Sequence, residues 1–523
     1  MKLDYKKTIY VGLAFLIISL FWQTYDAIIT KILIDKFGLN QTWSGFVMAL
    51  DNILALFLLP FFGGLSDRTN HKRGRRTPYV VVGTLLAAFL FVGLSFFDAM
   101  QLEKLDAETT LRVEYDNAAG FTEELTVAEW RTISNTMDGH SESTHVLGIL
   151  DAVHDGTTNR IYEETDTLSL ADYNDAKDAY YRYLSAQALE VTMASPTVFI
   201  VFIVMLFFTL VAMSIFRSPA VALMPDVTTK VLRSKGNALI NLMGAFGGIT
   251  AIILLTVFGL DQHSFVNYTA AFVSVSIIMV VVLGIFLWKV NEPKLVQERI
   301  DFEKVNNIVD EEETENHDKI SKDKFMSLVL ILASVFLWFM GYNAVTTKLS
   351  DYAPKVLNMG YSTPLLIAQA TAIVGFIPIG IISTKWGRKK TILFGIALLT
   401  LCFGSVYFIT ETTGILLYVV LGLTGIAWAS INVNSYPMVV ELSKGSDVGK
   451  YTGYYYTFSM AAQILTPILS GFLMDIPDFG RKILFPYATV FVIFSFITML
   501  FVKHGDAKAE KKSLLENFDV DMD

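Results

Sequence analysis

Long apolar blocks alternate with polar segments along the chain, and this alternation predicts the elements. Each block holds about 20 residues with almost no charge, the length that an α-helix needs to cross a bilayer core of roughly 30 Å. We therefore predict twelve membrane-spanning helices. They cover residues 8–30, 43–63, 78–97, 196–222, 236–258, 268–289, 325–346, 363–383, 391–409, 413–434, 452–474 and 483–503.

The first block follows three lysines, so a cleaved signal peptide is an alternative. The block is too long for that, and it continues into Trp22, Tyr25 and Asp26 without a small-residue cleavage site. We therefore expect a retained helix. Lysine and arginine set the orientation, because they gather in cytoplasmic loops. With the N-terminus inside, the inner segments carry 28 basic residues and the five short outer loops carry 6, so both termini are expected in the cytoplasm.

Two polar segments are much longer than a loop. Residues 98–195 hold 20 acidic and 6 basic residues, a net charge of −14, and parts of them have a helical pattern, so we expect a helical extracytoplasmic insertion. Residues 291–324 are densely charged and predict a cytoplasmic linker. The predicted organisation is a six-helix bundle over 1–290 that includes the insertion, then the linker, a six-helix bundle over 325–504 and a tail over 505–523.

Composition narrows the class of protein. Of the 523 residues, 53% are hydrophobic and 17% are charged, whereas soluble domains carry about a quarter charged residues. This excludes a soluble enzyme, a coiled coil and a disordered chain, and predicts an all-α membrane protein. The single cysteine, Cys402, excludes a disulfide framework and a cysteine-based metal site, and the net charge of −9 argues against nucleic acid as a partner. The sequence has no Walker loop, Gly-x-Ser-x-Gly elbow or His-Glu-x-x-His pair, so we expect no enzyme activity, cofactor or metal.

The two predicted bundles resemble each other in sequence. Residues 25–31 (YDAIITK) match residues 342–348 (YNAVTTK) at four of seven positions, at an offset of 317. The same offset places Gly63 on Gly380. Six-plus-six repeats are how alternating-access transporters are built, with the binding site between the repeats near the midplane. The repeat therefore predicts two halves with a site between them.

The polar turn after the second block has fixed glycines and an aspartate. Residues 64–78 read GLSDRTNHKRGRRTP, and a weaker copy stands at 380–391. A basic cytoplasmic loop would explain the charge, but not the glycines, the aspartate or the copy. The turn resembles the loop 2–3 signature of the major facilitator superfamily, in which the matching acid is thought to hold the two halves together on the inside. By this resemblance the gating candidates are Gly64, Asp67, Arg68, Gly74, Arg75 and Arg76, to which we add Arg217 at the inner end of the fourth helix.

Three further segments resemble a narrower branch, the sucrose-transporter-like and glycoside–pentoside–hexuronide sugar:cation symporters. They are residues 60–68, residues 219–226, and residues 428–437 followed by 449–453. The resemblance covers essentially all twelve helices and leaves out the insertion. It implies proton- or sodium-driven import of a di- or oligosaccharide across the cell membrane. Because the acidic, helix-compatible insertion stands between two complete spans, we expect it to be dispensable for transport.

The sequence departs from that branch at two places. Sodium-coupled members carry acids just before the helix-2 proline, where this chain has Ala55 and Leu59. Protons are therefore favoured over sodium as the coupling ion. Plant-type sucrose carriers have an arginine two residues after the helix-4 proline, where this chain has Val221 and its nearest arginine is Arg217, about one turn upstream.

Asp26 and Asp51 are the only acids well inside the predicted spans. An ionised side chain deep in a bilayer costs several kcal/mol, so it normally faces the bundle interior or a water-filled cavity. Asp51 is mid-helix beside Asn52, and we expect it to carry the coupling proton, with Asp26 as the substitute. The alternatives are a structural hydrogen bond for Asp51 and a snorkelling position for Asp26, which lies nearer the outer mouth.

Sugars are bound by hydrogen bonds to their hydroxyls and by aromatic faces against the apolar side of the ring. Polar and aromatic residues share helix faces at 22 and 26, 338 and 342, and 428 and 432. Because 13% of the chain is aromatic, this pairing is better evidence than any single residue. The predicted substrate-binding residues are Trp22, Gln23, Tyr25, Asp26, Asn52, Asn241, Trp338, Tyr342, Asn343, Gln369, Trp428, Asn432 and Gln463.

Two other functions stay open. One is a sugar sensor or receptor built on the transporter fold, with the acidic insertion as its ligand or partner module. The other is an exporter of another small solute, which the absence of a proline among the helix-5 glycines weakly disfavours. In the leading hypothesis the partners are a sugar, a proton and the lipid bilayer, and the protein acts as a monomer.

Overall fold

The computed structural model of the protein describes residues 4–151, 162–229, 232–261, 265–305, 321–442 and 448–505. Within these ranges the regular structure is helical, apart from one isolated bridge between Thr126 and Thr167. The helices are α1 (Tyr5–Lys31), the π-helix η1 (Ile32–Lys36), α2 (Gln41–Asp67), α3 (Thr77–Glu108), α4 (Leu111–Ala119), α5 (Val127–Thr136), α6 (Ser141–Asp151), α7 (Leu170–Ala194), α8 (Thr197–Val227), α9 (Arg233–Val257), α10 (Thr269–Lys289), α11 (Glu292–Val305), α12 (Lys322–Val356), α13 (Ser362–Trp386), α14 (Arg388–Val406), α15 (Leu416–Val440), α16 (Val448–Asp475), the 3-10 helix η4 (Arg481–Ile483) and α17 (Leu484–Leu500).

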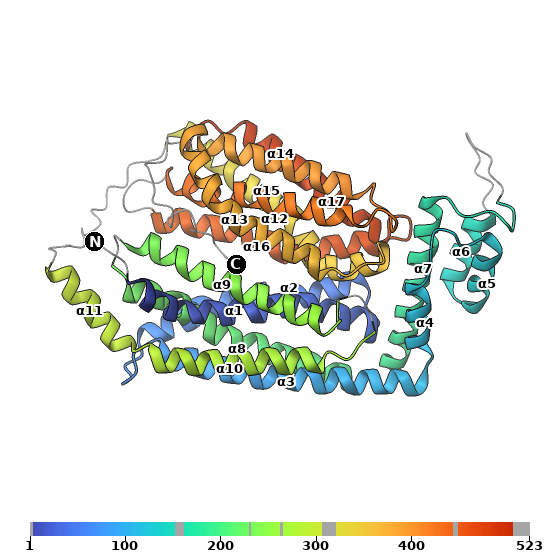
Figure 1. Ribbon diagram of the computed structural model, residues 1–523, viewed down its shortest axis with the longest axis horizontal. Coiled ribbons are helices and arrows are strands. Elements are labelled where there is room, and N and C mark those ends of the chain that lie inside the picture. Colours follow the sequence, from blue (N-terminus) through green and yellow to red (C-terminus); the bar gives the residue numbers. More distant parts are fainter. Residues whose placement is uncertain are drawn as a thin grey trace.

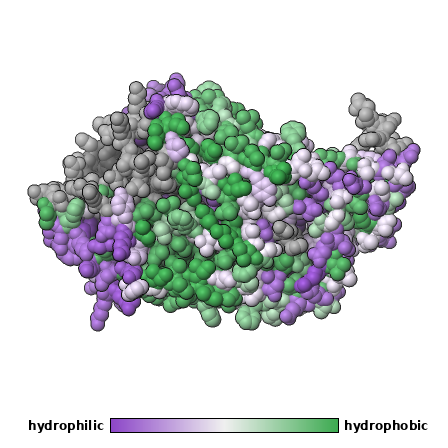
Figure 2. All heavy atoms as spheres, viewed as in Figure 1, coloured by the Kyte–Doolittle hydropathy of each residue, from purple (hydrophilic) through white to green (hydrophobic). Residues whose placement is uncertain are grey.

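The protein is a membrane protein by the length and composition of its helices. Eleven helices in the described ranges are long and apolar enough to cross a bilayer. The remaining predicted span falls on α13, whose apolar stretch Ser362–Phe376 is shorter. Figure 2 shows apolar residues over the middle of the molecule and hydrophilic residues toward its two ends.

The long helices form two groups that lie against each other along their lengths (Figure 1). The first group contains α1, α2, α3, α8, α9 and α10, and the second contains α12 to α17. The short helices α4 to α6, together with α7, lie beyond one end of these groups, which we call the cap end. We call residues 98–195 the cap. The opposite end, where α2 turns into α3, is the loop end.

Several helices run further than the sequence predicts at the cap end. Helix α12 continues ten residues past position 346, and η1 extends α1 to Lys36. Their charged residues look like loop in the sequence, but Asp35, Lys348 and Lys355 are almost completely buried. The reason is that Asp35 and Lys355 pair with each other between the two groups, and Lys348 donates hydrogen bonds to Gln41 across the same boundary, as described below. The linker also differs from the prediction, because it starts with the helix α11; its acidic run at 310–313 lies outside the described residues.

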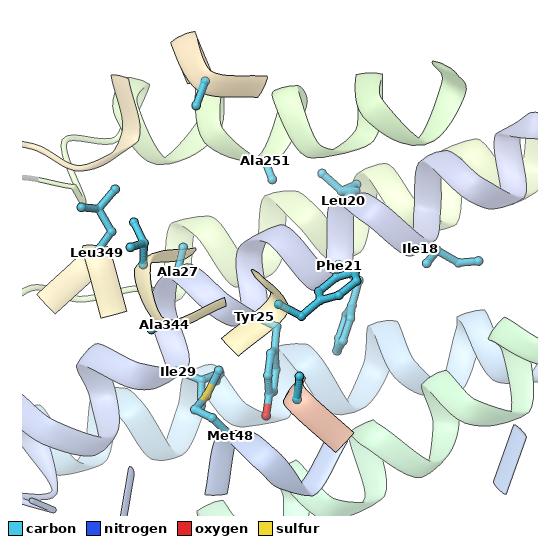
Figure 3. Close-up of a cluster of buried hydrophobic side chains, with 14 of the residues drawn as sticks. Ile18, Leu20, Phe21, Tyr25, Ala27, Ile29, Met48, Ala251, Ala344 and Leu349 are labelled. Carbon is cyan, nitrogen blue, oxygen red and sulfur yellow. The ribbon is translucent and has the colours of Figure 1, made fainter. Parts of the chain in front are cut away.

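The two groups approach most closely where α2 meets α16 at the cap end. A Cβ atom on Gly45 would lie 2.1 Å from the carbonyl oxygen of Pro467, and one on Gly471 would lie 2.3 Å from that of Gln41. Only glycine permits this backbone approach, which is how helices in membranes pack tightly. Elsewhere one continuous apolar core connects the helices, including Phe21 and Tyr25 of α1, which lie side by side in Figure 3.

Candidate functional site

A cavity of about 320 Å³ lies between the two helix groups, within the size range of small-molecule sites. Both groups contribute to its wall, and Gln369 of α13 donates a 2.5 Å hydrogen bond to Gln23 of α1 across it. Twelve predicted substrate-binding or coupling residues line this cavity: Trp22, Gln23, Asp26, Asp51, Asn52, Asn241, Tyr342, Asn343, Gln369, Trp428, Asn432 and Gln463. Residues from seven helices, distant in sequence, therefore meet at one place.

Aromatic rings form one wall of the cavity. Tyr342 of α12 stacks on Trp428 of α15, with ring centroids 3.7 Å apart and planes 6° from parallel. Phe339 meets Trp428 edge to face at 5.4 Å. On the opposite helix group, Trp22 lines the same cavity. Aromatic faces are thus available on both sides for the apolar face of a ligand.

The two carboxylates face the cavity from neighbouring helices of the first group. Asp26 and Asp51 are half-buried and lie within electrostatic reach of each other. Asp51 accepts a 2.8 Å hydrogen bond from Asn52 and lies within electrostatic reach of Arg217. The guanidinium of Arg217 also lies 5.8 Å from the centroid of the Trp22 ring. The structure therefore places Arg217 at the cavity, whereas the sequence analysis added it to the gating residues as a residue at the inner end of the fourth helix.

Two buried donors in the cavity wall have no hydrogen-bond partner among the described residues. They are the indole Nε1 of Trp22 and the amide Nδ2 of Asn343. A buried polar group without a partner costs free energy of about 1–3 kcal/mol, so such groups usually receive a partner. A ligand with several acceptor oxygens would supply it.

Tyr25 and Trp338 are not placed at the cavity. Both are fully buried in the apolar core and do not line it. The predicted list also missed several residues that do line it, including Thr346 and Thr347. These threonines follow Tyr342 and Asn343 by one helical turn, and this i, i+4 spacing was the available signal.

One ion pair between the two helix groups, extended by two pairs within the second group, closes the cap end of the cavity. Lys355 of α12 lies 2.5 Å from Asp35 of η1 and 2.5 Å from Asp351, and Arg481 lies 2.8 Å from Asp351. We call these four residues the cap-end network. Their side chains are at most 4% exposed.

Hydrogen bonds beside this network reinforce the closure. Lys348 donates to Oε1 of Gln41 at 2.9 Å, and Gln41 donates to Asp351 at 2.6 Å. The carboxylate of Asp475 accepts from the backbone of Gln41 and Thr42, both at 2.8 Å. The start of α2 is thus held by α12 and by the end of α16.

At the loop end, the predicted gating residues pair within the first helix group. Arg76 is buried and pairs with Asp67, and it also pairs with Asp226 at the end of α8 at 2.8 Å. Arg75 pairs with the same carboxylate at 2.6 Å. The second group repeats this arrangement, because Arg388 at the start of α14 lies 2.9 Å from Glu441 just past α15. Gly64 and Arg68 are exposed.

The linker completes the loop motif. The carboxylate of Glu292 accepts hydrogen bonds from the backbone of Arg75, Arg76 and Thr77 at 2.8–3.1 Å, at the N-terminus of α3, where a negative charge is favoured. Gly74 has a φ of +103°, and a Cβ atom there would lie 2.2 Å from the Glu292 side chain. The position therefore needs glycine.

Comparison with known proteins agrees with this architecture. The sequence model of the Major Facilitator Superfamily matches residues 184–435 and 365–515, and the model described as MFS/sugar transport protein matches residues 10–113. A D-xylose-proton symporter has a similar structure, with a TM-score of 0.56 at 14% identity over 95% of this chain and 98% of that one. The inward open xylose transporter XylE from E. coli gives 0.52 at 14% identity over 97% and 98%. A bacterial homologue of the iron transporter ferroportin, in an inward-facing state, gives 0.56 at 11% identity over 95% and 99%.

At such low identities the solved structures establish the fold alone, since a D-xylose-proton symporter and a bacterial homologue of an iron transporter share it. The sequence model of the superfamily establishes more than the fold, because its matches span more than half of the chain. In the structure the loop motif of each half contributes an arginine–carboxylate pair, Arg75 with Asp226 and Arg388 with Glu441. The chain belongs to the major facilitator superfamily.

Proposed function

We propose that the protein is a secondary active transporter that imports a di- or oligosaccharide together with a proton by alternating access. The observation that carries the proposal is the composition of the central cavity. Amides, two carboxylates and stacked aromatic rings line one space between the two helix groups. Hydroxyl-rich rings need both kinds of contact, and a buried carboxylate in a cavity suits a proton pathway. The sugar-transport description of the model matching residues 10–113 supports the substrate class.

The access state follows from the two ends of the cavity. The cap-end network and the α2–α16 contact join the groups at the cap end. At the loop end, a Cβ atom on Gly64 or Gly453 would meet nothing within 4 Å, so both positions face open space. With the loop end in the cytoplasm, as the distribution of basic residues favours, this is an inward-facing arrangement.

The remaining architecture belongs to the same proposal. Helix α13 crosses the membrane as well and brings the number of spans to twelve. The bundles comprise residues 1–290 and 325–504, and both termini lie in the cytoplasm. The linker and tail at 291–324 and 505–523 are then cytoplasmic, and the cap at 98–195 is outside. The protein works as a monomer in the cell membrane, with Asp51 as the coupling residue and Asp26 as its substitute and sugar ligand.

Uptake by the purified protein in liposomes tests the proposal. A panel of radiolabelled di- and trisaccharides is offered with an inward proton gradient, an inward sodium gradient or neither. We expect one or more sugars to accumulate above the external concentration only under the proton gradient, and a protonophore to abolish that accumulation. Protein-free liposomes are the control.

Each other result assigns a different function. Sugar binding, seen as a thermal shift without any accumulation, would make the protein a sensor. Accumulation that follows only the sodium gradient would replace the proton as the coupling ion. Transport only in the outward direction would favour the exporter.

A further inference from the structure

The cap is seated firmly on the first helix group. Its helices enclose a separate apolar core, which Phe265 from the connection between α9 and α10 joins. The Phe265 ring stacks on Tyr115 of α4, with centroids 5.2 Å apart and planes 22° from parallel. Gln101 of α3 donates to the carbonyl of Lys36 and to Thr192 of α7, both at 2.9 Å. The cap therefore moves with the first group.

Helix α7 of the cap reaches across to the second group. Asp178 lies 2.5 Å from Arg481, and its side chain is 10% exposed. The preceding residue, Lys177, forms an ion pair with Glu411, which follows α14. These two side chains are 2% and 11% exposed. Tyr173 donates a 3.0 Å hydrogen bond to the same Glu411 carboxylate. Two pairs of buried charges thus join the cap to the group on which it is not seated.

These pairs are continuous with the cap-end network. Arg481 holds Asp178 with one guanidinium nitrogen and Asp351 with another, and Asp351 in turn holds Lys355. Cap rings cover both cations, because the Tyr181 ring lies 5.4 Å from Lys355 and 5.7 Å from Arg481. A single chain of charges therefore runs from the cap through the second group to Asp35 in the first.

Opening at the cap end must break these contacts. The two helix groups cannot separate there while Asp178 holds Arg481 and Lys177 holds Glu411, because the cap belongs to one group and both partners belong to the other. Separating buried partners without replacement leaves uncompensated charges, which is strongly unfavourable. The contacts of the cap thus favour the state that is closed at the cap end.

We infer that the cap takes part in gating the cavity at the cap end. The contacts of Asp178 and Lys177 of α7 with the second group stabilise the closed state of that end. This goes beyond the proposed substrate and coupling ion, and it holds for any solute carried. It also replaces the expectation that the insertion is dispensable, which rested on its position between two complete spans. No sequence pattern pointed to Asp178, because its partner lies 303 residues away.

Accessibility of a cysteine in the cavity tests this inference without any substrate, so its outcome is independent of the proposed function. The natural cysteine is removed by Cys402→Ser, and Thr346→Cys places a thiol in the cavity wall. Membrane vesicles of each orientation are treated with a membrane-impermeant maleimide. We expect Asp178→Asn to raise the labelling rate from the cap face by about tenfold and to lower it from the loop face. The control Glu190→Gln removes the same charge from an exposed position on the same helix and should change neither rate.

Exchanging the charges of the Lys177–Glu411 pair gives a second test that does not depend on the folding of Asp178→Asn. Lys177→Glu and Glu411→Lys should each raise labelling from the cap face, and the double variant should return it toward the parent rate because the pair is restored. If Asp178→Asn fails to insert in the membrane, the exchange decides alone. Unchanged cap-face labelling in Asp178→Asn and in both exchange singles, with parental loop-face labelling, would overturn the inference and leave the cap as a passive cover.

Discussion

Asp51 and Asp26 line the same cavity but have different surroundings. Asp51 accepts a hydrogen bond from Asn52 and lies near the charge of Arg217, so its negative form already has compensating partners within the first helix group. Asp26 lies one turn beyond Trp22, whose indole donor has no hydrogen-bond partner in the described part of the chain. These surroundings favour a coupling role for Asp51 and direct ligand contact for Asp26.

Replacing Asp51 with asparagine should separate coupling from binding. A coupling group must gain and lose a proton between the two access states, and an amide cannot. We expect Asp51→Asn to fill liposomes with sugar only to the external concentration under a proton gradient, while exchange of internal for external sugar continues. Asp51→Glu should retain part of the accumulation. Full gradient-driven accumulation by the asparagine variant would move coupling to Asp26 or away from the carboxylates.

Replacing Asp26 should instead weaken binding itself. A hydrogen bond to a charged group contributes about 1.5–3 kcal/mol, so its loss should raise the Kd for the sugar by roughly 10- to 100-fold. Isothermal calorimetry on Asp26→Asn gives this directly, with Asp51→Asn as the matched control that keeps its affinity. Equal affinity in the two variants would remove Asp26 from the binding site.

The cost of polar groups in lipid explains which cavity residues could be predicted from the sequence. Amides and carboxylates in apolar helices usually face the interior, so Gln23, Asn343 and Gln369 could be predicted from their positions inside apolar spans. Aromatic residues carry no such constraint, and Tyr25 and Trp338 accordingly fill the core. Contacts such as the stack of Tyr342 on Trp428 depend on how distant helices meet, and no local pattern contains that information.

At the scale of elements, the spans were predictable and their ends were not. The thickness of the bilayer fixes the length of an apolar block, which is why α10, predicted as 268–289, is observed at Thr269–Lys289. Helices α1 and α12 run further, because Asp35 and Lys355 compensate each other's charge between the two groups. A single span gives no sign of such a partner, so a charged residue in its sequence resembles a loop.

We expect the loop motif to act through helix ends, with an effect that depends on the access state. In the structure the side chain of Asp67 is 54% exposed and pairs with Arg76. Its charge therefore contributes little to the stability of this access state. In the opposite state we expect the loop end to close and the carboxylate to face the N-terminus of α16, near residues 449–452, which lie partly outside the described side chains. A carboxylate at a helix N-terminus contributes about 1 kcal/mol.

Asp67→Asn should therefore raise the population of the loop-open state by roughly fivefold. The labelling rate of Thr346→Cys from the loop face measures this population. Asp301→Asn, which removes an exposed acid from the linker helix α11, is the control and should leave the rate unchanged. An unaltered rate in Asp67→Asn would place the inner gate elsewhere.

At the scale of the whole molecule, we expect the two ends to control one equilibrium. The cap-end network and the pairs made by α7 stabilise the state in which the loop end is open, and the loop motif is expected to stabilise the state in which it is closed. A ligand or a substitution shifts this equilibrium only through its different effect on the two states. Changes at opposite ends should therefore oppose each other although they share no contact.

The double variant Asp67→Asn with Asp178→Asn tests this directly. Asp67→Asn favours the loop-open state, whereas Asp178→Asn removes a contact that only the cap-closed, loop-open state makes. Because the residues are far apart and share no partner, their free energies should add within about 0.3–0.5 kcal/mol. The ratio of loop-face to cap-face labelling in the double variant should then equal the product of the two single effects. A ratio that follows only one of the singles would mean that the two ends act on separate steps and are not joined in one alternating-access equilibrium.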